Sequence, residues 1–361
     1  MKIRMNQFPV IFCFIILLVS CSVDDYEPIN CEDKLGYDIA KGDVILASQG
    51  QVNALLLRGN HQIKGNLYIG HCSDRGLRNI SDLTALSNIT KIDGELSIVG
   101  NSGLKDLHGL HNLTEIGGGL NISSNDKLEN FDALKKLSSI GGGFNLFGNP
   151  VLKNINGLSN LKSFNGSVNI SVNKELVSID GLKNIFSIQG DFNIGLNEKL
   201  ISLDGLDNLA SIQGKLNIGS NQNLSNIDAL HNLQLVKNSI EIRGNPVLTS
   251  IDGLSGISEV NGLLWITDNL TLLTIEGLQN ITKVSGNLTI YNNDKITTVD
   301  GLRNIEQVGV GLSISDNAKL TDLCGIVKLL KTPNGFDSSF EVIDNLYNPT
   351  REEIISGNCK N

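Results

Sequence analysis

The sequence predicts a β-solenoid, a right-handed parallel β-helix-like stack of about 11 coils with 24 residues in each coil. The first observation is a column of asparagines at a constant interval, at Asn101, Asn125, Asn149, Asn173, Asn197, Asn221, Asn245, Asn269, Asn293 and Asn317. The second is an excess of glycine, with 38 in 361 residues, that largely keeps the same interval. Because a repeat of this length cannot bury its apolar residues alone, successive repeats must stack on one another.

The apolar residues of each coil change their spacing partway along it. Leu96 and Ile98 are two residues apart, as in a strand with one buried face. The next apolar residues follow at intervals of three, at Leu104, Leu107, Leu110, Leu113 and Ile116. An interval of three fits neither a long strand nor a helix of several turns. We therefore predict one short strand per coil, joined into a long parallel sheet, and a tightly wound return path.

Asparagine and glycine both mark turns of the predicted coil. The asparagine follows each strand, where its amide can donate to and accept from backbone groups near the core, so we assign it a structural role. Glycine occupies two columns, one before the strand, as at Gly94 and Gly118, and one in the next turn, as at Gly109 and Gly157. Both columns predict a positive φ or a close approach of two backbones. The acids of that turn come one per coil, which does not form a calcium loop, so we expect no metal and no cofactor.

The chain begins with a targeting segment. Lys2 and Arg4 precede an apolar run over residues 8–18, which is too short to span a bilayer as a helix, so residues 1–20 are a predicted signal peptide. The sequence Leu-Val-Ser-Cys that ends at Cys21 resembles the lipobox of bacterial lipoproteins. It predicts lipidation of Cys21, which would anchor the mature chain in an outer membrane. A plain secretory signal and an uncleaved membrane anchor are the alternatives.

The repeat sets the expected boundaries of the mature chain. An acidic tether covers residues 21–41, an N-terminal cap 42–66, the solenoid 67–331 and a C-terminal cap 332–361. Ser48 is placed to cap a short helix, and Pro349 lies near the start of a final helix. Capping elements of this kind stop a solenoid from growing end to end.

The cysteines predict two disulfides. One of the six leaves with the signal peptide and Cys21 is assigned to lipidation, which leaves four. Cys72 lies in the first coil and Cys324 in the last, and a disulfide between these ends would have to bridge the rod, whereas disulfide Cα atoms lie within about 7 Å. We therefore predict the pairs Cys31–Cys72 and Cys324–Cys359, each of which pins a cap to its terminal coil in an oxidising compartment.

Several segments carry a resemblance to a known family: Gly42-Asp43-Val44-Ile45-Leu46, Gly65-Asn66-Leu67-Tyr68-Ile69, the repeated Asp-Gly-Leu-x-Asn-Leu, and Tyr347-Asn348-Pro349-Thr350 with Cys359. Over residues 42–361 the chain resembles surface lipoproteins of Bacteroidetes with receptor L-domain-like, leucine-rich-type repeats. The acidic residues 22–27 resemble the export signal of these lipoproteins. The resemblance implies an extracellular solenoid, exposed on the cell surface, that binds a ligand rather than catalysing a reaction.

The outward face of the predicted sheet holds the candidate ligand site. Five asparagines follow one another in its middle column, at Asn121, Asn145, Asn169, Asn193 and Asn217. They form either a ladder of hydrogen bonds along the sheet, which we favour, or a surface for a ligand. Beyond them, Glu241, Arg243, Trp265 and Tyr291 fall within about two coil spacings, roughly 10 Å. An aromatic residue beside charged groups can stack on a sugar ring or anchor a peptide, so these four are the predicted ligand-binding residues. Ordinary surface decoration is the alternative.

The sequence contains no recognisable catalytic cluster. Glu241 is a single carboxylate, whereas glycoside hydrolysis ordinarily uses two, and no phosphate-binding loop or dinucleotide fingerprint is present. A net charge of −9 without basic tracts makes nucleic acid an unexpected partner. We predict a monomeric, non-enzymatic surface lipoprotein that binds a glycan or a protein. A carbohydrate-active enzyme of the β-helix type and a structural spacer without a specific ligand are the alternatives.

Overall fold

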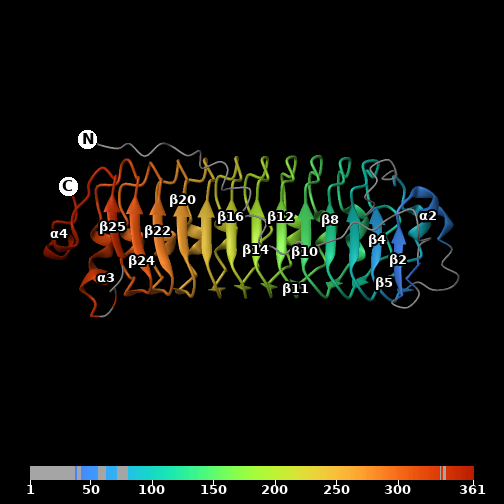
Figure 1. The fold of residues 1–361 in the computed structure, drawn as a ribbon, viewed down its shortest axis with the longest axis horizontal. Coiled ribbons are helices and arrows are strands. Elements are labelled where there is room, and N and C mark those ends of the chain that lie inside the picture. Colours follow the sequence, from blue (N-terminus) through green and yellow to red (C-terminus); the bar gives the residue numbers. More distant parts are fainter. Residues whose placement is uncertain (1–36, 39–41, 56–61, 71–79, 334, 336–338) are drawn as a thin grey trace, which may run out of the picture.

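The computed structural model describes residues 37–38, 42–55, 62–70, 80–333, 335 and 339–361. They form a rod, and one long sheet of 14 strands covers the face that Figure 1 shows. The predicted solenoid with a long parallel sheet is confirmed. The strands are β1 (Tyr37–Asp38), β2 (Asp43–Leu46), β4 (Leu67–Gly70), β6 (Leu96–Val99), β8 (Leu120–Ser123), β10 (Phe144–Phe147), β12 (Val168–Ser171), β14 (Phe192–Gly195), β16 (Leu216–Gly219), β18 (Ile240–Arg243), β20 (Leu264–Thr267), β22 (Asn287–Tyr291), β24 (Gly311–Ser315) and β25 (Ser339–Ile343).

Neighbouring strands pair in register, one coil apart. β1 is antiparallel to β2, and the strands that follow pair parallel. In β10, for example, Leu146 pairs with Ile122 of β8 and with Ile170 of β12. This register places equivalent residues of successive coils on one another. Leu96 and Ile98 of β6, for example, point into the core and are fully buried. The buried residues form one continuous apolar core along the rod, and its burial drives the stacking of the coils.

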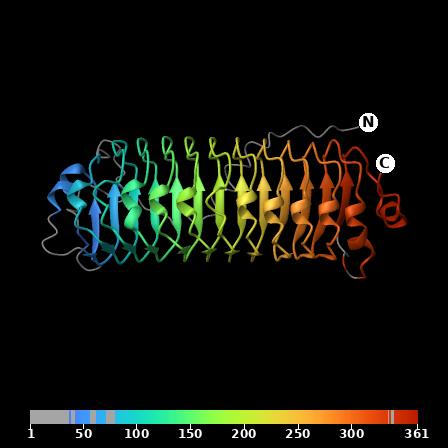
Figure 2. The same ribbon diagram turned by 180° about the vertical axis from the view of Figure 1, so that it is seen from behind.

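The return path runs behind the sheet, where Figure 2 shows a row of short turns. Apolar residues at intervals of three suit the 3₁₀ helix, which has about three residues per turn. A side chain two residues upstream accepts a hydrogen bond from the first residue of such a turn, as when Asp180 N donates to Ser178 Oγ at 3.1 Å. The turns are η4 (Thr84–Leu86), η5 (Asp132–Lys136), η6 (Asn156–Leu158), η7 (Asp180–Leu182), η8 (Asp228–Leu230), η9 (Asp252–Leu254), η10 (Glu276–Leu278), η11 (Asp300–Leu302) and η12 (Cys324–Ile326).

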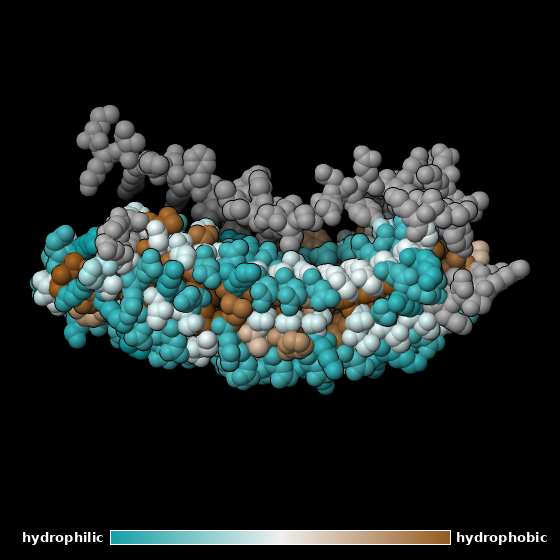
Figure 3. Space-filling model, turned by 90° about the horizontal axis from the view of Figure 1, so that it is seen from below, coloured by the Kyte–Doolittle hydropathy of each residue, from teal (hydrophilic) through white to brown (hydrophobic). Residues whose placement is uncertain are grey.

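Two-residue strands complete the return path and form three small sheets at one edge of the rod. Seen from that edge, the rod is gently bowed and mostly polar, with apolar side chains scattered along it (Figure 3). Phe186 and Leu235 of this edge are 54% and 40% exposed. The short strands are β3 (Gln62–Ile63), β5 (Lys91–Ile92), β7 (Glu115–Ile116), β9 (Ser139–Ile140), β11 (Ser163–Phe164), β13 (Ser187–Ile188), β15 (Ser211–Ile212), β17 (Leu235–Val236), β19 (Glu259–Val260), β21 (Lys283–Val284) and β23 (Gln307–Val308).

The asparagines that follow each strand form a continuous chain of hydrogen bonds, here called the inner ladder. Asn221 is typical: its N donates to Asn245 Oδ1 at 3.1 Å and its Nδ2 donates to Ile194 O at 3.1 Å. Its own Oδ1 accepts from the N and Nδ2 of Asn197. The structural role predicted for this column is confirmed. The members are Asn101, Asn125, Asn149, Asn173, Asn197, Asn221, Asn245, Asn269, Asn293, Asn317 and, after an interval of 28 residues, Asn345.

In the two glycine columns, the missing side chain lets the backbones of neighbouring coils approach closely. Positive φ angles mostly occur in another column. A Cβ on Gly277 would lie 1.9 Å from the carbonyl oxygen of Ile251, and one on Gly118 would lie 2.8 Å from Glu95 N. The prediction of close approach is therefore right for both glycine columns. Gly109 and Gly205 also have a positive φ, but the column with a positive φ in coil after coil is the residue before each inner-ladder asparagine. It holds Gly100, Ser124, Gly148, Val172, Leu196, Ser220, Gly244, Asp268, Asn292, Asp316 and Asp344.

Both ends of the rod carry small capping elements. At the first, α2 (Gln49–Ala54) begins after Ser48, whose hydroxyl accepts from Gln51 N. At the other, α3 (Val327–Lys331) packs against α4 (Arg351–Ser356), and Thr350 with Glu353 forms a capping box at the start of α4. The predicted disulfide Cys324–Cys359 is confirmed, with its Cα atoms 4.9 Å apart. It pins the C-terminal residues to η12.

Three other predictions fall outside the described residues. Cys21, the predicted lipidation site, and the predicted pair Cys31–Cys72 lie there, as do residues 1–20. Within the ranges that the structure describes, no helix is long and apolar enough to cross a bilayer. The signal peptide, the lipid anchor and the first disulfide therefore stay predictions.

Candidate ligand-binding site on the long sheet

The middle column of the sheet's outer face begins as a second chain of hydrogen bonds, here called the outer ladder. Asn121 Nδ2 donates to Ser97 Oγ at 3.0 Å, and Asn145 Nδ2 donates to Asn121 Oδ1 at 2.9 Å. Asn169 continues the ladder with a bond of 2.8 Å to Asn145 Oδ1. Each amide donates toward the N-terminal end of the rod. For these coils the hydrogen-bonded alternative, favoured from the sequence, is confirmed.

Asn217 of β16 is the last member of the outer ladder. Its Nδ2 donates to Asn193 Oδ1 at 3.4 Å, but its own Oδ1 is buried and accepts no hydrogen bond from any residue that the structure describes. The next residue in the column is Glu241 of β18, which pairs in register with Asn217. An ionised carboxylate has no proton to donate, so Glu241 cannot continue a ladder in which each coil donates to the one before it. The ladder therefore stops with two acceptors side by side.

Glu241 is an unusually buried carboxylate for an outward-facing position, at 7% exposure. Lys215 Nζ lies 3.7 Å from its Oε1, and an Arg243 guanidinium nitrogen lies 3.5 Å from its Oε2. These two cations balance its charge, which burial would otherwise make costly. Both contacts are longer than a charge-assisted hydrogen bond, whose length is about 2.7–2.9 Å. The carboxylate oxygens thus keep their capacity to accept hydrogen bonds.

Trp265 of β20 lies beside Glu241 on the other side and pairs with it in register. The side chain is half-buried, and its Nε1 is a buried donor without an acceptor among the described residues. Buried indole N–H groups usually find a partner, so this one calls for an explanation. Across three neighbouring strands, an unpaired acceptor, a carboxylate with accepting capacity and an unpaired donor lie in one row.

The two remaining predicted residues lie in the adjacent column. Arg243 is the last residue of β18, the strand that also holds Glu241. Its side chain packs over Gly219, where an added Cβ would lie 3.6 Å from Arg243 Cγ. Thr267 separates Arg243 from Tyr291 in the register, so Tyr291 lies two strands from Arg243. Tyr291 is 37% exposed. The structure thus brings Glu241, Arg243 and Trp265 together and places Tyr291 at the margin.

Tyr291 lies in an acidic environment. Burial raises the pKa of its phenol, and the nearby carboxylates of Asp316 and Asp268 raise it further. The pKa of Asp316 is itself raised, first by burial and then by Asp344 and Glu341. Tyr291 therefore keeps its proton at neutral pH and can donate a hydrogen bond from the edge of the site.

Two residues of the site were not singled out from the sequence. Asn217 was predicted only as one of the five asparagines of its column, and Lys215, in the column before the strand, was not predicted. Only the direction of hydrogen bonding shows that Asn217 Oδ1 is left without a donor. The signal that was available in the sequence is the change from asparagine to glutamate at Glu241, where the column loses its repeat.

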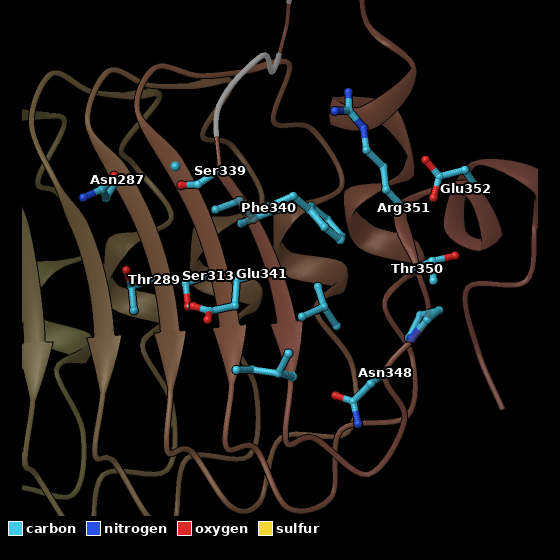
Figure 4. A pocket seen from close by; sticks show the side chains of 15 residues that line it. Asn287, Thr289, Ser313, Ser339, Phe340, Glu341, Asn348, Thr350, Arg351 and Glu352 are labelled. Atoms are coloured by element: carbon cyan, nitrogen blue, oxygen red, sulfur yellow. The ribbon is translucent and has the colours of Figure 1, made fainter. Parts of the chain in front are cut away.

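A separate hollow of about 770 Å³ lies near the C-terminal end, between the last strands of the sheet and the segment that leads into α4 (Figure 4). Glu341 of β25 accepts from Ser313 Oγ at 2.9 Å within it. Figure 4 shows Thr289 on one side of the hollow and Arg351 and Glu352 on the other. Its neutral hydroxyl and amide groups come from both walls, and its charged groups are Glu341 of the sheet and Arg351 and Glu352 of α4. This hollow was not predicted from the sequence.

No protein-family model and no curated protein matches the sequence. Among solved structures, an internalin from Listeria monocytogenes is similar at 18% identity over 81% of this chain and 88% of the internalin, with a TM-score of 0.37. A leucine-rich-repeat protein from Leptospira interrogans is similar at 20% identity over 75% of this chain and 76% of its own, with a TM-score of 0.35. The solenoid assignment rests on the sheet, its register and the inner ladder.

Proposed function

We propose that this chain is a non-enzymatic surface lipoprotein that binds an extracellular ligand with the outer face of its long sheet. The observation that carries the proposal is the row formed by Asn217, Glu241 and Trp265, where the outer ladder ends in an unpaired acceptor, a carboxylate and an unpaired donor. Buried polar groups without partners are costly, and a ligand that pairs with them would recover that free energy. The lipobox-like sequence at Cys21 supports attachment to an outer membrane, and the resemblance to Bacteroidetes surface lipoproteins with receptor L-domain-like repeats supports exposure on the cell surface.

Of the two ligand classes, a glycan fits the row better than a protein. A sugar hydroxyl both donates and accepts, so neighbouring hydroxyls can donate to Asn217 Oδ1 and Glu241 while accepting from Trp265 Nε1. The ring of Trp265 offers a face on which a sugar can pack. The five-strand run of neutral amides beside it, from Asn121 to Asn217, extends the same chemistry along the rod.

The site does not favour the enzyme alternative. Glu241 lies between the cations of Lys215 and Arg243, and no second carboxylate contacts it among the described residues. Its neighbours in the row are an amide and an indole, whereas the usual glycosidase pairs two carboxylates. Turnover of any member of a polysaccharide library by the purified chain would contradict this assignment.

The decisive test is a glycan and protein array probed with the purified full chain, followed by the variant Trp265→Ala. We expect binding to a glycan, and a loss of affinity of at least roughly tenfold in the variant, since aromatic anchors carry much of the binding free energy. Phe147→Ala is the matched control, because Phe147 is an aromatic residue of β10 that is 43% exposed and lies outside the row. The thermal unfolding midpoint of both variants verifies that the fold is kept. A ligand that binds Trp265→Ala and Tyr291→Ala as tightly as the unaltered chain would place the site elsewhere.

A further inference from the structure

We propose that a basic hollow at the edge where the strands end, the upper edge in Figure 1, binds the carboxylate or sulfate group of an acidic saccharide. The hollow measures about 520 Å³ and is lined by lysines from successive coils. It lies on coils that precede Glu241 and on a different side of the rod from the sheet face. The proposal is therefore independent of the function proposed above.

Backbone hydrogen bonds between coils hold the lysines in place. Glu129 N donates to Lys105 O at 2.9 Å, and Lys153 N donates to Glu129 O at 3.1 Å, so these three residues stack one coil apart. Lys127 joins them from the preceding turn, and Lys174 borders the hollow from the coil that follows. Because the positions are fixed by the ladder of the solenoid, the ammonium groups can converge without ordering a loop.

The charges of the hollow are not balanced. Lys174 pairs with Glu198 at 3.4 Å, and Glu175, which also lines the hollow, pairs with Lys199 at 2.6 Å. Lys105, Lys127 and Lys153 have no ion pair among the described residues, and Glu129 is the one further carboxylate of the lining. Three cations therefore face one anion on a chain whose net charge is −9. An oxyanion is the group that would complete this site, because like charges held close together repel and a bound anion relieves the repulsion.

Apolar groups beside the lysines indicate what carries the anion. Pro150 and Val151 line the hollow, and Val177 continues the column of Lys153, whose carbonyl oxygen accepts from Val177 N at 3.0 Å. Val177 is 47% exposed. A sugar ring presents an apolar face of C–H groups next to its charged substituent, which matches this combination. The concave shape and the volume, within the range of about 300–1,000 Å³ typical of small-ligand sites, favour a saccharide over a flat membrane surface.

The test measures binding of the full chain to three immobilised probes: oligogalacturonate, dextran sulfate and uncharged dextran. We expect binding to at least one anionic probe and not to dextran through this site, with affinity that falls as salt screens the charges. The triple variant K105Q/K127Q/K153Q should weaken binding by at least roughly tenfold, as expected when charge-assisted hydrogen bonds are lost. The control K237Q/K295Q/K319Q removes the same charge from exposed lysines outside the hollow and should change affinity less than about twofold.

Four results would overturn the proposal. They are absence of binding to both anionic probes, unchanged affinity in the hollow variant, an equal loss in the control variant, and binding to phosphatidylglycerol vesicles in place of the anionic saccharides. Thermal unfolding of both triple variants verifies that they fold. Trp265→Ala, measured on the same probes, separates the two sites, because it should leave binding at the hollow unchanged even if the sheet-face site fails its own test.

Discussion

Two columns of asparagine run along the same sheet, one beside the core and one on the outer face, and they differ in continuity. The inner ladder, from Asn101 to Asn345, joins each coil to the next, and its far end is closed by Asn348, whose Oδ1 accepts from Asn345. The outer ladder ends in the middle of the sheet, at Asn217, whose Oδ1 is unpaired, whereas the unpaired Oδ1 of the inner ladder belongs to Asn101, its first member. The same side chain therefore stabilises the fold where the repeat is unbroken. Where the repeat breaks, it leaves Asn217 Oδ1 and Trp265 Nε1 without partners among the described residues.

The largest expected effect comes from breaking the inner ladder. Asn221→Ala removes the acceptor of Asn197 and the donor to Ile194 O, all buried, and leaves those groups without partners. We expect the free energy of unfolding to fall by about 4 kcal/mol, since each unsatisfied buried group costs about 1–3 kcal/mol. Chemical denaturation followed by circular dichroism measures it.

The matched variant in the outer ladder is Asn169→Ala. Its amide lies on the partly exposed face, where water can replace the bond to Asn145, so we expect a loss of about 1 kcal/mol. Equal losses for the two variants would show that the ladders do not differ in the way the structure indicates.

A second prediction restores the outer ladder where it ends. Glu241→Asn places an amide beside Asn217, and in the direction of this ladder its Nδ2 would donate to the unpaired Asn217 Oδ1. It also removes a buried charge. We expect the free energy of unfolding to rise by about 1 kcal/mol. Ligand affinity should fall roughly tenfold, because a stable site and a binding site make opposing demands.

The control for this exchange is Glu259→Asn, which removes an exposed carboxylate from the short strand β19. It should change stability by less than about 0.5 kcal/mol and leave ligand affinity unaltered. If Glu241→Asn lowers stability instead, Glu241 contributes more through Lys215 and Arg243 than its position in the ladder costs.

The fold was largely predictable because the same pattern of asparagine, glycine and apolar residues recurs in nearly every coil. Asn345 was not predicted because it follows Asn317 by 28 residues, and a search at a fixed period of 24 residues does not detect it. The column with positive φ escaped for another reason. Only three of its members are glycines, Gly100, Gly148 and Gly244, while the glycine-rich columns serve close contacts between backbones. Composition alone does not separate these two uses of glycine.

The candidate site was predictable only in part, since a site appears in the sequence as a departure from the repeat. Glu241 and Trp265 depart from their column and were found. Asn217 is the asparagine that its column predicts. Its Oδ1 is unpaired because each amide donates to the coil before it, and a sequence does not show the direction of hydrogen bonds. The basic hollow was missed because Lys105 and Lys153 share a column with Glu129, while Lys127 and Lys174 join them from other positions of the coil.

The smallest expected effect concerns the residue between the two ladders, where the chain leaves the outer face and turns toward the inner asparagine. Val172 holds a φ of 62° there, a conformation that is costly for a β-branched side chain and that asparagine adopts more readily. Asn292 occupies the same column with a φ of 52°. Val172→Asn should therefore raise the free energy of unfolding by about 0.5 kcal/mol, part of the relieved strain being offset by lost packing of the half-buried valine.

The variant Gly148→Val places a valine in the same column, at a φ of 66°, and so introduces the strain that Val172→Asn removes. It should lower the free energy of unfolding by about 1 kcal/mol. Denaturation midpoints of the two variants, measured side by side, should move in opposite directions. A shift of both in the same direction would mean that packing, rather than backbone strain, governs this column. In that case the stability of this column would depend on side-chain packing, as it does in the core. The outer ladder and the inner ladder would then differ only on the outer face of the sheet.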